Sequence, residues 1–284
     1  MRNDQEMMDD IIDFATTDSR IKAVLLNGSR ANPLATKDRY QDFDVVYVVE
    51  EVESWLNDIG WIDVFGQRIM LQMPETMRNP ANDGNFAFLM LFEDGNRIDL
   101  TLMPMSNIDM ANLDKMTVVL LDKENRFSQV ERPSDRLFHV QPPTELEYIS
   151  CCNNFLWCLQ NVAKGIARDE LPYAMEMYEQ IVRSEFNSMI SWYIGVLTDF
   201  SVSVGKMGKY FKRYLPEHIY RMIKETYSDG NYDHMWKSVF IAIECFELVA
   251  TDVGHYLNIP YNQKDHQNMV RYLIDFKDKL NGES

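Results

Sequence analysis

The chain has 284 residues, of which 46% are apolar and 25% charged, a balance typical of one large or two modest globular domains. Its formal net charge is −16, and such a field repels nucleic acid and attracts cations. We therefore expect no nucleic-acid partner, and the charge favours divalent metals or a cationic small molecule. An acidic surface that only keeps the protein soluble explains the charge equally well.

The cysteines and the N-terminus both favour the cytoplasm. Cys151, Cys152, Cys158 and Cys245 form no C-x-x-C pair, which argues against a disulfide framework or a zinc site and predicts reduced side chains in a core. Residues 1–8 are polar and lack the apolar core of a signal peptide, and no stretch reaches the roughly 20 apolar residues of a membrane span. We expect a cytoplasmic protein with no membrane partner, monomeric or weakly dimeric.

The first half of the chain alternates between helix and strand signals. Apolar residues at helical spacing predict helices, and short apolar or β-branched runs predict strands. The hairpin signal is the strongest, because Asp94-Gly95 supplies turn chemistry between two apolar runs. The predicted elements are a helix at 5–15, strands at 21–26 and 42–49, a short helix at 55–61, a strand at 68–72, hairpin strands at 86–92 and 97–102, and a helix–strand segment at 113–131 with its strand at 118–121.

Helix signals dominate the second half. A linker with Pro133 at one end and Pro142-Pro143 at the other precedes Thr144 and Glu147, which form a capping box that opens a helix. The predicted helices span about 144–167, 172–198, 217–227, 233–257 and 265–280. The sequence thus predicts an α+β fold, with a mixed sheet and flanking helices at 1–133 and a helical bundle at 134–284.

Asp42 and Asp44 are the first candidates for chemistry. They stand at i and i+2 of a predicted strand, so both carboxylates point to the same face. Carboxylates this close repel each other unless a cation neutralises them, and Mg²⁺ takes such oxygen ligands together with substrate phosphates. The spacing alone is a weak signal, since the chain has five acid-x-acid pairs. Only this pair opens an apolar strand and closely follows a Gly-Ser turn.

Asp99 is the third candidate. It lies between Ile98 and Leu100 in the second hairpin strand, where an unpaired carboxylate is costly. One interpretation is an ion pair with Arg97 or Arg68 on the same sheet face. The other is a carboxylate cluster in which Asp99 binds metal and takes the proton of an attacking hydroxyl.

The turn at Gly28-Ser29 is a candidate phosphate site. It offers backbone N–H groups and a hydroxyl, and Arg30 adds a cation. Gly-Ser by itself is a very common turn, so this signal depends on the neighbouring aspartates.

A second phosphate candidate is the basic segment 205–213 in an otherwise acidic chain. Lys206 and Lys209, or Lys209 and Lys212 with Arg213, would share a helical face. The segment predicts a triphosphate clamp or, alternatively, a solvated basic face. It is not a Walker motif, and no G-x-G-x-x-G dinucleotide motif occurs.

Other residue types offer less. The five histidines are scattered and predict neither a metal site nor a catalytic triad. Trp157, Trp192 and Trp236 lie on predicted helices, where core or interdomain packing is expected, and one of them is a candidate for the wall of an acceptor pocket.

Together these motifs resemble those of the DNA polymerase β-like nucleotidyltransferases, which carry Gly-Ser, then Asp-x-Asp, then a third Asp on a neighbouring strand. Within that superfamily the chain is similar to the aminoglycoside 6-adenylyltransferases, also called streptomycin adenylyltransferases. The resemblance covers nearly the whole chain. The matching stretches are LNGSR at 26–30, QDFD at 41–44, LFEDGNRIDLTL at 91–102, CCNNF at 151–155, AKGIAR at 163–168, GKMGKYFKRYL at 205–215 and MWKS at 235–238.

The resemblance implies a role for each candidate residue. Asp42 and Asp44 would bind Mg²⁺, and Asp99 would be the third metal ligand and the base. The implied nucleotide-binding residues, which would contact ATP, are Gly28, Ser29, Arg30, Lys206, Lys209 and Lys212.

The expected protein is therefore an ATP- and Mg²⁺-dependent adenylyltransferase. Residues 1–133 would form its catalytic domain, and residues 134–284 would hold the acceptor and clamp ATP. The expected acceptor is a hydroxyl of a cationic aminoglycoside, with streptomycin first, and pyrophosphate is released. Transfer to another metabolite or to a protein remains open, as does a nucleotide-binding module without turnover.

Overall fold

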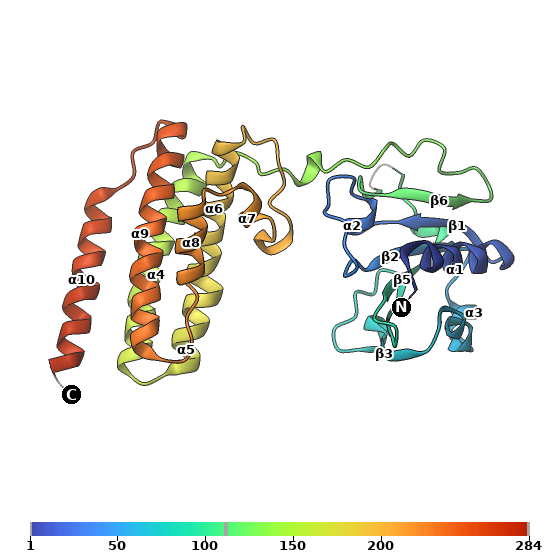
Figure 1. The fold of residues 1–284 in the computed structure, drawn as a ribbon, viewed down its shortest axis with the longest axis horizontal. Helices are drawn as coiled ribbons and strands as arrows, with labels where there is room; N and C mark the ends of the chain where they lie inside the picture. Colours follow the sequence, from blue (N-terminus) through green and yellow to red (C-terminus); the bar gives the residue numbers. More distant parts are fainter. Residues whose placement is uncertain (1, 111–112, 283–284) are drawn as a thin grey trace. The chain divides into compact units, whose positions relative to one another are not determined.

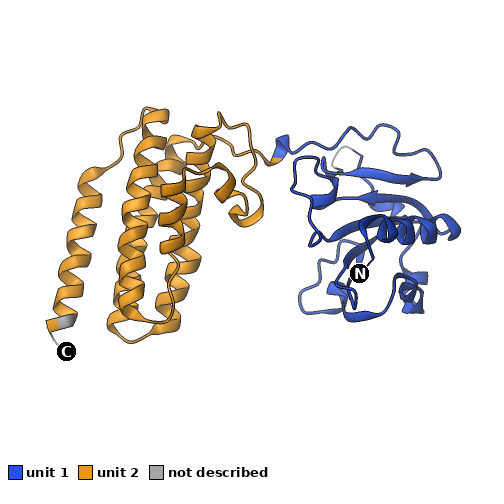
Figure 2. Cartoon of the chain, in the orientation of Figure 1, with its two compact units in different colours: residues 1–137 blue, residues 138–284 orange. Residues whose placement is uncertain are grey.

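A computed structural model describes residues 2–110 and 113–282. The chain divides into two compact units, residues 1–137 and residues 138–284 (Figure 2). Over the described ranges, no helix is long and apolar enough to cross a membrane.

A six-stranded mixed sheet is the centre of the first unit (Figure 1). Its strand order is β3-β4-β5-β2-β1-β6. Strands β2 and β5 pair in parallel, and the other neighbouring pairs are antiparallel. The strands are β1 Ile21–Leu26, β2 Phe43–Val49, β3 Arg68–Gln72, β4 Phe86–Phe92, β5 Arg97–Pro104 and β6 Val118–Asp122.

The alternation of side chains along β2 and β5 places apolar core residues on one face and the carboxylates on the other, where Val46 and Val48 further along β2 belong to a second apolar cluster. On the core face Ile98 and Leu100 are fully buried and belong to the same apolar cluster as the buried stripe of helix α1, Asp4–Thr17. On the opposite face the same strands carry Asp44 and Asp99, which are only partly buried. Because the side-chain period is two, a slip of one residue would exchange these faces, so the core fixes where the carboxylates point.

The remaining elements of the first unit are short. The helix predicted at 55–61 is divided between an α-helical turn and a 3₁₀ helix. The helix predicted within 113–131 is wrong, because residues 113–117 form turns that lead into β6, and the Asp114 side chain accepts a hydrogen bond of 2.8 Å from the Met116 backbone N–H. The short elements are α2 Gly28–Ala31, α3 Glu53–Leu56, η1 Ile59–Phe65, η2 Pro74–Thr76, η3 Met105–Asn107 and η4 Arg136–Phe138.

Over the described residues of the second unit, every regular element is a helix, and loops connect the helices (Figure 1). Its first helix begins with the predicted capping box of Thr144 and Glu147. The helix predicted at 172–198 contains a π-helical segment, η5, between α5 and α6. The elements are α4 Glu145–Ala167, α5 Leu171–Glu176, η5 Met177–Val182, α6 Arg183–Leu197, η6 Lys206–Gly208, α7 Phe211–Tyr214, α8 Glu217–Glu225, α9 Tyr232–Leu257 and α10 Gln263–Gly282.

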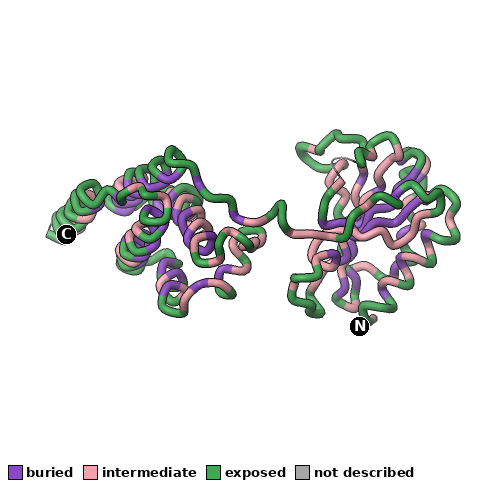
Figure 3. The backbone as a smooth tube through the Cα atoms, turned by 90° about the horizontal axis from the view of Figure 1, so that it is seen from above, coloured by how far each residue is buried: buried purple, intermediate pink, exposed green. Residues whose placement is uncertain are grey.

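Each unit has its own core (Figure 3). In the helical unit the stacked rings of Phe155 and Phe246, 3.8 Å apart, join α4 to α9. All four cysteines are free, as predicted, and three of them are buried in this core. The predicted α+β fold, a mixed sheet with helices followed by a helical bundle, is confirmed.

Candidate active site

The turn after β1 lies directly against the start of β2. The Asn27 backbone N–H donates to the Asp44 carbonyl at 2.8 Å, and Gly28 has a φ of +67°. A Cβ atom on Gly28 would lie 2.0 Å from Oδ2 of Asp44, a distance that no other residue tolerates without movement. The Ser29 hydroxyl makes no hydrogen bond within the described residues. The structure therefore brings the predicted phosphate turn and one predicted metal ligand into contact.

The pairing of β2 with β5 brings the other carboxylates to the same place. Asp44 is the register partner of Asp99 across the two parallel strands, and Asp42 lies just before β2. The side chains of Asp42 and Asp99 are 41% and 21% exposed. Partial burial, and to a smaller extent repulsion by Asp99, raise the pKa of Asp42. The three predicted aspartates thus lie near the N-terminal ends of the two central strands, β2 and β5.

Arg97 neutralises part of this charge. Its guanidinium donates from Nε to Oδ1 and from Nη2 to Oδ2 of Asp99, both at 2.7 Å, and its Nη1 lies 3.6 Å from Oδ2 of Asp42. These carboxylates, together with Asp44, raise the pKa of Arg97, with the Asp99 hydrogen bonds as the largest cause. The ion-pair interpretation of Asp99 is therefore present in the structure, with Arg97 as the partner. Arg68, the other candidate, pairs with Asp63.

The donor set fits a hard divalent cation. Asp42, Asp44 and Asp99 offer the carboxylate oxygens that Mg²⁺ prefers, on or just before two strands that pair in register. Within residues 2–110 and 113–282, no three His, Cys, Asp or Glu side chains are close enough to hold a metal as they stand. Arg97 supplies the positive charge in this arrangement. A magnesium site on these aspartates stays a prediction.

Arg30 has a structural role that the sequence did not reveal. Its guanidinium donates to the carbonyls of Gln41 and Asp42 at 2.8 and 3.1 Å and to Oδ2 of Asp4 at 2.8 Å. It also lies 3.6 Å from the centre of the Phe43 ring, and its side chain is only 8% exposed. Arg30 therefore ties the phosphate turn to the beginning of β2. Its contact with ATP phosphates stays a prediction.

The basic segment of the second unit is an irregular loop. Lys206, Lys209 and Lys212 are exposed, as a phosphate clamp requires. Of the two predicted pairings, a shared helical face of Lys206 and Lys209 is wrong, because Met207 has a φ of +57° and interrupts the helical turn between them. Lys212 and Arg213 lie on the short helix α7, and a face shared with Lys209 stays a prediction.

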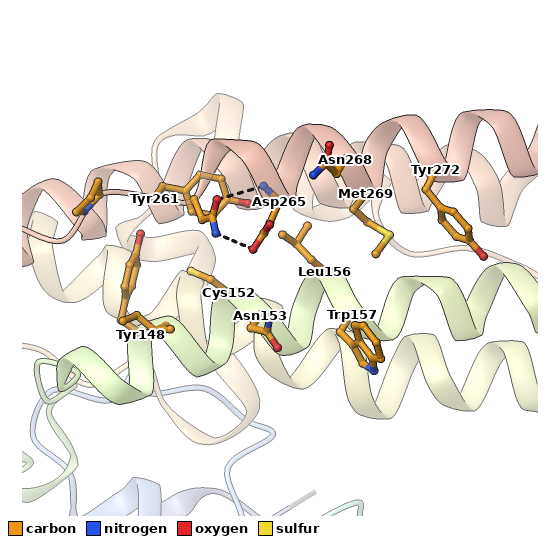
Figure 4. A pocket seen from close by; sticks show the side chains of 13 residues that line it. Tyr148, Cys152, Asn153, Leu156, Trp157, Tyr261, Asp265, Asn268, Met269 and Tyr272 are labelled. Carbon is orange, nitrogen blue, oxygen red and sulfur yellow. Dashed lines mark hydrogen bonds between the residues drawn. The ribbon is translucent and has the colours of Figure 1, made fainter.

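A groove with a volume of about 470 Å³ lies between α4 and α10 (Figure 4). Trp157, which is 62% exposed, and Tyr272 line one end, and the side-chain amides of Asn153 and Asn268 line its walls. Trp157 is therefore a surface residue rather than part of the core, whereas Trp236 is buried in it. The sequence offered Trp157 as one of three candidates for the wall of an acceptor pocket, but it did not predict a groove between α4 and α10.

Comparison with known proteins decides the family. The family model described as streptomycin adenylyltransferase matches residues 1–276. The chain belongs to the streptomycin adenylyltransferase family. The predicted family is thus confirmed, and so is the prediction that this family member is an enzyme of the nucleotidyltransferase class.

Individual members of the streptomycin adenylyltransferase family are similar over almost their full length. An aminoglycoside 6-adenylyltransferase of Campylobacter jejuni is 39% identical over 281 residues, which cover 98% of this chain and 97% of that protein. One of Bacillus subtilis is 40% identical over 96% of this chain and 97% of the relative, and one of Staphylococcus aureus is 32% identical over 95% and 98%. A crystal structure of an aminoglycoside 6-adenyltransferase from Bacillus subtilis matches with 34% identity, 98% and 99% coverage, and a TM-score of 0.48.

Proposed function

We propose that this protein transfers AMP from ATP to a hydroxyl of an aminoglycoside, with streptomycin as the first candidate, and releases pyrophosphate. The observation that carries the proposal is the register of β2 and β5, which aligns Asp44 with Asp99 beside a turn that only glycine fits. The names of the relatives, aminoglycoside 6-adenylyltransferases at 32% to 40% identity, support the acceptor class.

The three aspartates would hold Mg²⁺. When bound there, the ion would supply positive charge to the phosphates of ATP, as it does in other phosphoryl-transfer sites. The backbone N–H groups at Gly28 and the free hydroxyl of Ser29 would bind phosphate oxygens. Because these groups belong to one unit and are fixed by contacts with Asp44, the α-phosphate would be held next to the carboxylates.

Asp99 would act as the base. In the proposed step the acceptor oxygen forms a bond to the α-phosphorus, its proton passes to a carboxylate oxygen of Asp99, and the bond from the α-phosphorus to the bridging oxygen breaks. The electron pair leaves with pyrophosphate. Lys206, Lys209 and Lys212 would neutralise the departing charge, as exposed cations can at this stage of transfer. In this proposal residues 1–133 form the catalytic domain. Residues 134–284 form the domain that holds the acceptor and clamps ATP.

The charge of the chain suits a cationic acceptor. A net charge of −16 raises the local concentration of polycations and speeds their association, an effect that salt screens. An aminoglycoside is such a polycation, whereas ATP is an anion and needs the local cations described above. The proposal therefore includes ATP as the co-substrate, a cytoplasmic location for the protein and no nucleic-acid partner.

The test is pyrophosphate release from ATP and Mg²⁺ with a panel of aminoglycosides, with mass spectrometry of the product. We expect an AMP adduct of streptomycin from the wild type and none from Asp99→Asn or Asp42→Asn. The matched control is Asp63→Asn, which removes a carboxylate that is 69% exposed and pairs with Arg68. Full activity in Asp99→Asn would refute the mechanism. An adduct on a different acceptor would refute the aminoglycoside, and ATP binding without pyrophosphate release for any acceptor would refute an active enzyme.

A further inference from the structure

We propose that Arg97 is an exchangeable counter-ion of the carboxylate cluster, which a divalent cation must displace before Asp99 can act. This inference rests on the proposed function, because it concerns the same three aspartates. It adds a residue that controls how tightly the site binds metal and whether its base is available.

Arg97 occupies both oxygens of Asp99. Each carboxylate oxygen accepts one N–H at 2.7 Å, so the bidentate pair covers the edge of the carboxylate. The same guanidinium lies 3.6 Å from Oδ2 of Asp42. One positive charge thus lies between Asp99 of β5 and Asp42 just before β2, two of the residues that would hold the proposed metal. Two positive charges cannot share that position without strong repulsion.

The surroundings of Arg97 allow it to leave. Its side chain is 43% exposed, and among residues 2–110 and 113–282 its side-chain hydrogen bonds and ion pairs go to Asp99 and Asp42. Its antiparallel register partner is Leu91, which is itself 38% exposed. Arg30 is a useful contrast, because its side chain is 8% exposed, lies over an aromatic ring and donates to backbone carbonyls. Arg30 is built into the fold, whereas Arg97 is held by the charges that a metal would take over.

A permanent clamp and an exchangeable counter-ion give opposite expectations for Arg97→Gln. If Arg97 only positions Asp99, its loss leaves that carboxylate misplaced, and metal binds more weakly. If Arg97 competes with the metal, its loss removes a positive charge from the site, and metal binds more tightly. The sign of the change in metal affinity therefore decides between the two.

The experiment titrates Mn²⁺ into the full-length protein without ATP, followed by calorimetry and by electron paramagnetic resonance. We expect Arg97→Gln to bind Mn²⁺ about tenfold more tightly than the wild type. Arg97→Lys keeps the charge without the bidentate fork and should lie between the two. In the metal-free protein Arg97→Gln should have a lower melting temperature, because three aspartates then repel one another, and saturating Mn²⁺ should restore it.

Arg68→Gln is the matched control. It changes the net charge by the same amount on the same sheet, but its partner is Asp63, away from the cluster. A gain in Mn²⁺ affinity in both variants would show a general charge effect and would overturn the proposal. Mn²⁺ binding by Arg97→Gln that equals or is weaker than that of the wild type would also overturn the counter-ion proposal. The proposed function survives that result if Asp99→Asn abolishes AMP transfer. Absence of Mn²⁺ binding in every variant would overturn this proposal, whereas the proposed function, in which ATP phosphates share the metal, is tested separately by pyrophosphate release.

Discussion

Replacing Gly28 by alanine tests the contact between the phosphate turn and the carboxylate cluster. The substitution imposes two costs. The backbone has a φ of +67°, where an L-residue is strained, and the new Cβ would lie 2.0 Å from Oδ2 of Asp44. Strain of this kind typically costs about 1–3 kcal/mol of unfolding free energy, equivalent to a fall of roughly 2–4 °C in melting temperature per kcal/mol for a domain of this size. Because Asp44 must move, we expect activity to fall further, by about a hundredfold, as for other displacements of about 1 Å near reacting groups.

The control for backbone strain is Gly84→Ala. Gly84 has a φ of +82°, so it pays a similar conformational cost, but its new Cβ would meet only the amide of Asn107, the end of a flexible side chain. Urea unfolding measures the stability of both variants, and pyrophosphate release measures kcat and KM. We expect comparable losses of stability and a large loss of kcat in Gly28→Ala alone. Equal kcat values in the two variants would refute the claim that the turn positions Asp44.

Two further predictions concern the lysines and an ion pair. The triple variant of Lys206, Lys209 and Lys212 to alanine should raise KM for ATP about tenfold with little change in melting temperature, because all three side chains are exposed. Lys237→Ala on α9, also exposed, is its control, and an unchanged KM would refute the clamp. Hydrogen bonds from Arg2 and Asn96 hold the pKa of Asp94 well below its usual range even though burial opposes them. A carboxyl with a lowered folded-state pKa stabilises the fold above its unfolded pKa of about 3.9 and loses that contribution as pH falls towards the folded value. The destabilisation by Asp94→Asn in urea unfolding should therefore be full at pH 6 and shrink below about pH 4, and a difference that does not vary with pH would contradict this.

Local patterns were sufficient to predict the elements of the sheet. The alternation of Ile98 and Leu100 with Asp99 depends only on the two-residue period of a strand, and the core confirms which face is buried. The helix predicted within 113–131 failed because Asp114 closes a turn through its own side chain, which competes with helical hydrogen bonds. The π segment at Met177–Val182 also went unpredicted, since apolar spacing does not report a one-residue change in hydrogen-bond register.

The site required contacts that are distant in sequence. The sequence identified Asp42, Asp44 and Asp99 as candidates, but no periodicity shows that β5 pairs with β2 in parallel or that Asp44 and Asp99 are register partners. Arg30 shows a role that the sequence did not reveal. Its position in the Gly-Ser-Arg turn predicts a phosphate ligand, and this contact stays a prediction. The fold also uses its guanidinium to donate hydrogen bonds to the carbonyls of residues 41 and 42 just before β2.

Asp99 has two interpretations, as the ion-pair partner of Arg97 and as a metal ligand and base. They exclude each other only if the site has a single state. A partly buried carboxylate needs positive charge nearby at all times, because leaving it unpaired is costly. In the structure Arg97 provides that charge, and under the proposed function a divalent cation provides it while the reaction proceeds. A protein whose cluster had no counter-ion of its own would lose stability whenever the metal left. A side chain that is 43% exposed and two residues from Asp99 on the same strand face can supply that charge and then withdraw into solvent. On this argument the site has two forms. In the resting form Arg97 pairs with Asp99, and in the form that would transfer AMP the three aspartates would hold the metal instead.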